Sequence, residues 1–166
     1  MSTIKFNDAE VQEMFREIAA RLGDLTEPMA AIGDMLVKST IQRFDEGISP
    51  EGVPWAAKSL ATIDAYRQRS ESRNTKMDNR PLHGPSGSLS STIYAQTGPT
   101  AARVGSPMVY AATMQFGALK GEFGTASNNT PIPWGNIPAR PFLGFSEDDR
   151  TAILETLTEW LEDADD

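Results

Sequence analysis

The sequence predicts a single-domain α+β protein with an N-terminal helical hairpin, a small antiparallel sheet, a long C-terminal helix and extended exposed loops. Three observations predict this class. Apolar residues recur at helical spacing near both ends of the 166-residue chain. Two short strand-like runs flank a turn signal in its middle. The chain also has 13 glycines and 11 prolines, so much of it must be turn or loop.

The first helix is predicted over residues 8–22. Asn7 and Glu10 have the spacing of a capping box, in which two side chains bond to each other's backbone N–H at a helix start. Gly23 is a favourable residue for ending a helix. The apolar residues that share one face are Val11, Met14, Phe15, Ile18 and Leu22.

A second helix is predicted from Thr26, as its N-cap, to the residue before Gly47, with Pro28 in its first turn. The two helices are separated by only a few residues, so we expect them to form a hairpin. The apolar side of the second helix is formed by Met29, Ile32, Leu36 and Phe44. These side chains are expected in the core.

The next segments are mostly polar. Residues 45–58 form a turn-rich link, and we expect Trp55 to hold this link against the core. Ser59 can cap a short helix that reaches about Arg69. Residues 70–88 contain almost no large apolar side chains, so they are predicted to be a flexible arm or loop.

An antiparallel hairpin is expected around residues 91–105, because the runs STIYAQ and AARVGS surround the turn signal Thr-Gly-Pro. The apolar run MVYAATMQFG then predicts one or two helical turns that end at Gly117. Residues 118–136 are rich in Gly, Asn and Thr and are predicted to be a second long loop.

The segment IPARPFLGF, residues 137–145, is predicted to be extended, because each of its two prolines restricts the residue before it. Ser146 and Asp149 then have capping-box spacing and begin the C-terminal helix. Its apolar stripe is predicted to consist of Ile153, Leu154, Leu157, Trp160 and Leu161.

Composition argues against several classes of protein. The chain has no cysteine, which removes disulfides, thiolate catalysis and cysteine-ligated zinc. Its formal net charge is −8, which disfavours general binding to nucleic acid. No apolar run approaches the ~20 residues of a membrane-spanning helix, and the N-terminus lacks the apolar core of a secretion signal. We therefore expect no membrane association and no secretion.

Charge is unevenly distributed along the chain. Residues 58–83 carry six basic and three acidic side chains, whereas the chain closes on LEDADD. Opposite charges at separate places suit head-to-tail contact between copies. Ordinary surface variation is the simpler interpretation of the charge pattern taken alone.

No enzymatic site is recognisable. His83 is the single histidine, and Gly-Pro-Ser-Gly at 84–87 breaks the spacing of a nucleophile elbow. One histidine and no cysteine offer little to a metal ion, and no cofactor motif is present. A pair of carboxylates for glycoside chemistry stays open, because the sequence does not exclude it.

Three segments combine glycine, proline and aromatic residues: FDEGISPEGVPW, VGSPMVYAATMQFGA and IPARPFLGFSEDD. At these segments the sequence resembles the phage virion morphogenesis or tail completion family of Mu-like and P2-like tailed phages. The block at 137–144 matches without a gap, and order and rough spacing hold from about residue 40 to 162. The other matched positions are Phe44, Gly47, Pro50, Gly52, Trp55, Lys58, Ser59, Thr62, Gly87, Leu89, Thr92, Val104, Gly105, Ser106, Tyr110, Ala111, Gln115, Phe116 and Gly117.

Two positions depart from the family's pattern. Met114 stands where the family usually has a histidine before Gln-Phe-Gly, and Ser86 stands in place of a threonine. The missing histidine removes a polar role at that position. It therefore weakens a catalytic interpretation further.

The resemblance implies a small structural protein of the head–tail junction, with no enzymatic activity, cofactor or small-molecule substrate. Such a protein acts as a homo-oligomeric ring, for which a hexamer is one candidate, that completes or caps the tail and contacts other neck and tail proteins. DNA would pass through the ring without specific binding. The implied location is the virion, and the host cytoplasm before assembly.

Two alternative functions stay open. The first is a transient morphogenesis factor that assists assembly and is absent from the mature particle. The second, from another class, is a hydrolase that uses carboxylates.

Ten residues in ordered-loop contexts are the candidates for structural or subunit contacts. They are Gly52, Trp55, Tyr110, Gln115, Phe116, Gly117, Pro138, Arg140, Pro141 and Phe142. Arg140 lies between two prolines and just ahead of the C-terminal helix. Because no nucleophile, base or metal set accompanies it, we expect it to bind a fixed carboxylate or carbonyl rather than to catalyse a reaction.

Overall fold

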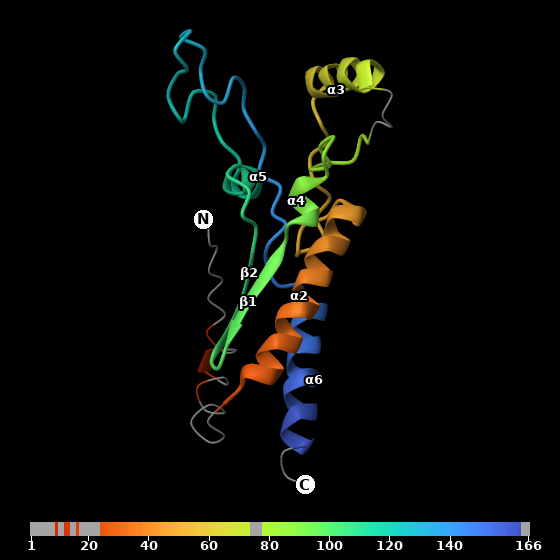
Figure 1. Cartoon of the computed structure of the whole chain (residues 1–166), viewed down its shortest axis with the longest axis vertical. Coiled ribbons are helices and arrows are strands. Elements are labelled where there is room, and N and C mark those ends of the chain that lie inside the picture. Colours follow the sequence, from red (N-terminus) through yellow and green to blue (C-terminus); the bar gives the residue numbers. More distant parts are fainter. Residues whose placement is uncertain (1–8, 10–11, 14–15, 17–23, 74–77, 164–166) are drawn as a thin grey trace.

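The computed structural model describes residues 24–73 and 78–163, together with Ala9, Gln12, Glu13 and Arg16. Within these residues the chain is an α+β protein with five helices and one two-stranded antiparallel sheet. The molecule is elongated, and two arms diverge at one end (Figure 1). The predicted helix over 8–22, and with it the N-terminal helical hairpin, falls almost entirely outside the described residues.

Helix α2 (Thr26–Glu46) is the longest described element. The Asp24 carboxylate accepts hydrogen bonds from the Thr26 N–H at 2.9 Å and from the Thr26 hydroxyl at 2.6 Å. Thr26 is therefore the first helical residue and not the predicted N-cap, because the aspartate upstream supplies the acceptor. The helix ends as predicted at Gly47, whose φ of 72° is the left-handed conformation that favours glycine.

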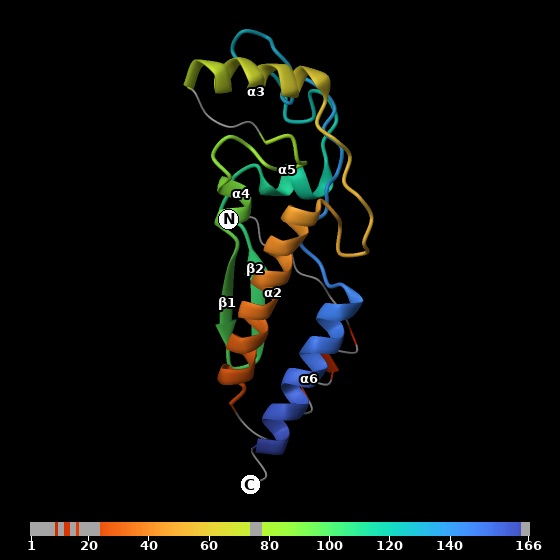
Figure 2. The ribbon, with the colours of Figure 1, turned by 90° about the vertical axis from the view of Figure 1, so that its right-hand side faces the viewer.

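A β-hairpin covers one side of α2 (Figure 2). Strand β1 (Tyr94–Gly98) pairs with β2 (Ala101–Gly105) in the antiparallel register expected for a hairpin. The first strand begins later than predicted, because residues 88–91 form the short helix α4 (Ser88–Ser91). Gly33 of α2 allows a close approach, since a Cβ there would lie 2.8 Å from Cγ2 of Thr97.

Helix α6 (Glu147–Asp163) lies on the other side of α2 (Figure 2). Its capping box is confirmed: the Ser146 N–H donates to the Asp149 carboxylate at 2.8 Å, and the Asp149 N–H donates to Ser146 Oγ at 3.1 Å. Ile153 is buried as predicted, but Leu154 is 42% exposed. The prediction that Leu154 belongs to the apolar stripe was wrong. Consecutive residues of a helix point about 100° apart, so Leu154 points away from the side of α6 on which Ile153 is buried, and α6 is covered on one side only.

The core consists of two clusters. The lower cluster in Figure 1 joins α2 to α6 through Leu25, Met29, Ile32, Leu36, Ile153 and Leu157. The upper cluster comprises Phe44, Trp55, Leu89, Ile93, Ala111, Phe142 and Leu143. At its centre the ring of Phe44 lies 5.5 Å from that of Trp55 and 5.2 Å from that of Phe142, measured between centroids. The upper cluster holds the segments from which the two arms leave the body.

The two arms are helix α3 (Leu60–Arg73) and the segment 118–136, which we call the loop arm. Ser59 caps α3 as predicted, because its Oγ accepts the Thr62 N–H at 3.2 Å, but the helix continues past Arg69. Among the side chains of α3 that the structure places, none is buried. Helix α5 (Ala111–Phe116) precedes the loop arm and ends at Gly117, as predicted.

Candidate functional site

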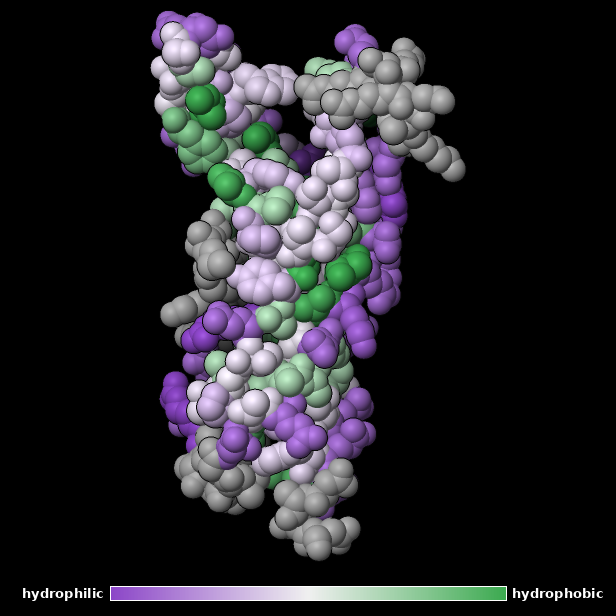
Figure 3. Space-filling model, in the orientation of Figure 1, coloured by the Kyte–Doolittle hydropathy of each residue, from purple (hydrophilic) through white to green (hydrophobic). Residues whose placement is uncertain are grey.

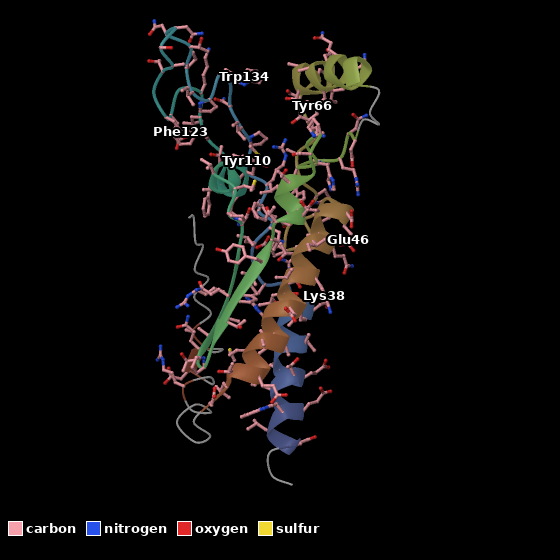
Figure 4. All side chains as sticks on the ribbon, in the orientation of Figure 1. Lys38, Glu46, Tyr66, Tyr110, Phe123 and Trp134 are labelled. Carbon is pink, nitrogen blue, oxygen red and sulfur yellow. The ribbon has the colours of Figure 1, made fainter. Side chains whose placement is uncertain are left out.

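A cleft of about 910 Å³ lies between the two arms. Ala61, Ala65 and Tyr66 of α3 line one wall, and Trp134 of the loop arm lines the other. Figure 4 shows Tyr66 and Trp134 on opposite sides of the gap. The cleft is large enough to hold several side chains of a binding partner, since its volume is that of a typical ligand pocket.

Lys58 lies at the root of α3 and lines the cleft. Its ammonium donates to the backbone carbonyls of Asp78 at 2.6 Å and His83 at 2.5 Å. The same nitrogen lies 5.0 Å from the centroid of the Tyr66 ring, within reach of a cation–π interaction. Burial lowers the pKa of Lys58, and the nearby charge of Asp78 opposes this effect.

Arg140 lies at the root of the loop arm and also lines the cleft. Its guanidinium donates to the backbone carbonyls of Ala56 at 2.7 Å and Ala57 at 3.0 Å, so its partners are carbonyls of the link before α3. Burial lowers its pKa. Within the described part of the chain, Lys58 and Arg140 are thus both held by carbonyl oxygens, and neither forms an ion pair with a described carboxylate.

Residues 78–83 connect the cleft to the end of α2. Arg80 bonds to the carboxylates of Asp78 and Asp45, each at a shortest distance of 2.7 Å. The side-chain hydrogen bonds from Arg80 are the main cause that lowers the pKa of Asp78 to about 2. The ring of His83 places Nε2 2.9 Å from the Phe44 carbonyl, which gives the single histidine a structural role. The flexibility of residues 70–88 stays a prediction.

The loop arm contains no helix and no strand of the sheet, yet its backbone is extensively hydrogen-bonded. Ala118 and Ile137 exchange two hydrogen bonds of 2.9 and 2.8 Å at its root. Further out, the Phe123 N–H donates to the Ile132 carbonyl at 2.8 Å. The arm therefore presents its side chains on a defined backbone.

Exposed apolar side chains gather at this end of the molecule. Of the twelve large apolar side chains that are exposed in the described residues, seven fall within residues 109–134. These seven are Val109, Tyr110, Phe116, Leu119, Phe123, Ile132 and Trp134. Apolar surface concentrated in this way is typical of a protein–protein interaction site.

The structure places several of the ten candidate residues inside the subunit. Gln115 is buried, and its Oε1 accepts the N–H groups of Phe142 at 2.9 Å and Leu143 at 3.0 Å. Its Nε2 donates to the Leu143 carbonyl at 2.9 Å. Trp55 donates its indole N–H to the Pro141 carbonyl at 2.8 Å. These contacts fasten residues 141–143 between α5 and the link before α3.

Two candidate glycines have a positive φ for different reasons. Gly117 has a φ of 76°, and a Cβ there would lie 2.7 Å from the Ile137 carbonyl oxygen. Gly52 also has a φ of 76°, but a Cβ there would meet nothing within 4 Å. Gly117 is therefore needed for the close approach of the two backbone segments that meet at the root of the loop arm, whereas Gly52 lies in a turn at the surface.

The other candidates are accessible. Tyr110 is 43% and Phe116 65% exposed, and Pro138 is also exposed. Tyr110 and Pro138 line the cleft, whereas Phe116 does not. These three residues are placed where a partner can reach them, and their role in subunit contacts stays a prediction.

Sequence reasoning missed the buried ion pair between Arg43 and Asp149. Arg43 also donates to the carbonyls of Phe142 at 3.2 Å and Gly144 at 3.0 Å and to the Ser39 hydroxyl at 2.9 Å. One signal was available, because position 43 continues the apolar face of α2 at helical spacing.

The apolar residues of the loop arm were also missed, because the composition of residues 118–136 suggested only a polar loop.

The described residues that line the cleft include no carboxylate, so the acid pair required for glycoside hydrolysis is not found there. In residues 24–73 and 78–163, no three His, Cys, Asp or Glu side chains gather in a way that could bind a metal ion. None of the described helices is long and apolar enough to cross a membrane.

The model of the phage virion morphogenesis family matches residues 6–162, which is nearly the whole chain. No curated protein and no solved structure matches the chain significantly. The match extends the resemblance beyond the loop segments toward both ends of the sequence.

Proposed function

Because the chain belongs to the phage virion morphogenesis family, we propose that it is a structural protein of the head–tail junction. In this proposal it assembles as a homo-oligomeric ring that completes or caps the tail. The observation that carries the proposal is the cluster of exposed apolar side chains within residues 109–134, beside a cleft. A free subunit leaves this surface in water, whereas assembly would cover it.

The backbone of the loop arm supports an assembly role. Its hydrogen bonds, such as that between Phe123 and Ile132, hold the exposed side chains in place before any partner arrives. Less conformational entropy is then lost on association, which strengthens binding for a given contact area. A preorganised apolar arm is thus suited to repeated contacts between identical subunits.

The acidic character of the chain fits a ring through which DNA passes. Helix α6 carries seven carboxylates and one arginine between Glu147 and Asp163, and the net charge of the chain is −8. A surface of this sign repels phosphates, so it would limit adhesion of DNA during passage. The proposed partners are therefore other copies of this chain and the neighbouring neck and tail proteins.

Mass spectrometry of purified phage particles tests this proposal. A ring component is expected at a fixed copy number per particle, and electron microscopy should place it at the head–tail junction. Purified protein should also form a defined oligomer in light scattering. Absence from the mature particle would contradict the structural role.

A transient morphogenesis factor is the second candidate, because the family description covers assembly in general. It would use the same apolar surface for temporary contact with assembling proteins. Such a factor would be found with immature particles and would be lost from finished ones, so quantification at both stages separates the two functions.

A further inference from the structure

The loop arm has two sides with different surroundings. Trp134 lines the cleft, whereas five exposed apolar side chains at the arm and its root do not line it; we call the four most exposed of these the outer ridge. They are between 56% and 94% exposed, and they are Val109, Phe116, Leu119 and Phe123. Figure 4 shows Phe123 on the side of the arm turned away from α3, and Figure 3 shows apolar surface on the arm and below it.

The outer ridge does not reach the cleft of its own subunit, because the arm itself stands between them. Turning the arm over would break the two bonds between Ala118 and Ile137 and the bond between Phe123 and Ile132. Among the described residues of one subunit, none covers the apolar ridge or fills the apolar cleft. A second molecule could cover each of them.

The ridge carries an exposed cation, Lys120, and an exposed carboxylate, Glu122, and the carboxylate complements the cations of the cleft. Glu122 is exposed next to Phe123, and its Oε2 accepts the Leu119 N–H at 2.6 Å, which fixes the carboxylate beside the ridge. The cleft contains Lys58 and Arg140, whose hydrogen-bond partners in the described chain are carbonyls. A carboxylate brought into the cleft would therefore meet two cations that lack an ionic partner at contact distance.

Building on the ring assembly proposed above, we infer that the outer ridge of one copy docks into the cleft of the next copy. A ridge and a cleft on different sides of a subunit form a heterologous contact, and such contacts close into rings when the rotation between subunits permits. Each loop arm is then covered on both sides. The neighbour's ridge covers Trp134, and the other neighbour's cleft covers Phe123.

Two single variants test the two surfaces separately. Phe123→Asp places a charge on the ridge, and Ala65→Trp fills the cleft from an exposed position on α3. Each should weaken self-association at least about tenfold in sedimentation or light scattering, as expected for central interface positions. Leu60→Asp is the matched control, because Leu60 is 79% exposed and lies outside both surfaces. Circular dichroism must show that all three variants fold.

A mixture of the two variants gives a sharper result. Phe123→Asp retains an intact cleft, and Ala65→Trp retains an intact ridge. An equimolar mixture should therefore form one good contact and give dimers, but no ring. If the ridge and the cleft belonged to unrelated interfaces, the mixture would behave like the sum of its parts, and the inference would be wrong.

Cysteine pairing locates the contact directly, because the chain has no cysteine of its own. A chain with both Phe123→Cys and Ala65→Cys should form a ladder of disulfide-linked oligomers under mild oxidation, in purified protein and in particles. A chain with Phe123→Cys and Leu60→Cys should not. An intramolecular disulfide in the first chain, or no ladder, would contradict the docking.

The charge component has its own control on the same arm. Glu122→Gln keeps an acceptor for the Leu119 N–H but removes the charge, so it should weaken association and flatten its dependence on salt. Lys120→Gln changes a charge of opposite sign two residues away and should not weaken association. Equal effects of the two substitutions would overturn the charge complementarity on which the docking rests.

These outcomes separate the inference from the proposed function. If the wild-type protein forms a ring and all cleft and ridge variants form it equally well, the docking is wrong and the ring stands. If the wild-type protein stays monomeric and is absent from particles, the proposed function itself fails.

Discussion

Arg43 is a charged residue on the buried face of α2, and its guanidinium is satisfied in several directions. It pairs with Asp149 of α6, and it donates to the carbonyls of Phe142 and Gly144. The side chain of Arg43 thereby joins α2, α6 and the segment that directly precedes α6. Such a pair contributes little net stability, but removing one partner leaves a buried charge without compensation.

Asp149→Ala should therefore destabilise the protein by about 3–5 kcal/mol. Urea unfolding followed by circular dichroism measures this change. Glu147→Ala is the control, because Glu147 pairs with Arg150 on the exposed side of the same helix turn and should cost less than about 1 kcal/mol. Similar losses for the two variants would show that the buried pair is not what stabilises this junction.

Arg140 holds a loop through its hydrogen bonds to Ala56 and Ala57. Arg140→Met keeps an apolar stem but leaves these carbonyls without their donor, so we expect a loss of about 1.5–3 kcal/mol in the free energy of unfolding. Arg103→Met, at an exposed position of β2, should have almost no effect. An unchanged stability of Arg140→Met would mean that the carbonyls find other donors.

At the scale of elements, the root of the loop arm depends on Gly117. Gly117 has a φ of 76° and a ψ of 179°, a conformation essentially restricted to glycine, and a Cβ there would lie against the Ile137 carbonyl. Gly117→Ala should therefore cost clearly more than the ~1–2 kcal/mol of a left-handed alanine. Gly52→Ala also places an alanine at positive φ, but in open space, and should cost only about 1–2 kcal/mol. Chemical denaturation of both variants compares them, and equal losses would exclude steric contact at the arm's root.

The segment 78–83 contributes a pH-dependent contact. The pKa of Asp78 is about 2 in the folded protein and 3.8 without its contacts, so the stabilisation is present above about pH 4 and is lost as the pH falls toward 2. Asp78→Asn should lower stability by less than about 1 kcal/mol at pH 7, because the pair is partly exposed.

Unfolding at pH 7, 4 and 2.5 should show that the difference between wild type and Asp78→Asn shrinks with acidity. In an Arg80→Ala background the same substitution should have a clearly smaller pH-dependent effect, because the side-chain hydrogen bonds from Arg80, the largest cause of the low pKa of Asp78, are then absent. A difference that persists undiminished in that background would assign the low pKa to another group.

At the scale of the whole molecule, the body and the arms differ in how they are stabilised. Helix α2 contacts both the hairpin and α6, whereas α3 has no buried side chain among those placed. A helix of 14 residues is marginal in water without tertiary packing. We therefore expect α3 to open locally at a lower free energy than the body, and we expect the proposed assembly to stabilise it.

Hydrogen exchange followed by mass spectrometry checks this difference. In the free subunit the amides of α3 should exchange faster than those of α2 by about two orders of magnitude or more, since exchange there requires only local opening. Formation of the oligomer should slow exchange in α3 and leave the core of α2 unchanged. Equal protection of both helices in the free subunit would contradict this division.

Much of the fold could be predicted because its signals are local. The end of α2 at Gly47, the capping box of Ser146 and Asp149 and the end of α5 at Gly117 each depend on a few neighbouring residues. The burial of Trp55 was also predicted, since it is the one large side chain of a polar link. The candidate site was predicted only in part, because the sequence does not show which loops meet.

The sequence by itself determined the main α and β segments, the family and the absence of cysteine chemistry, since periodicity, capping and motif order are properties of short stretches. Only the tertiary structure decided that Arg43 is buried, that Arg140 binds backbone carbonyls and that two arms enclose a cleft. These contacts join residues 83 to 106 positions apart in the chain. Their partners are chosen by the packing of whole elements, which no local pattern records.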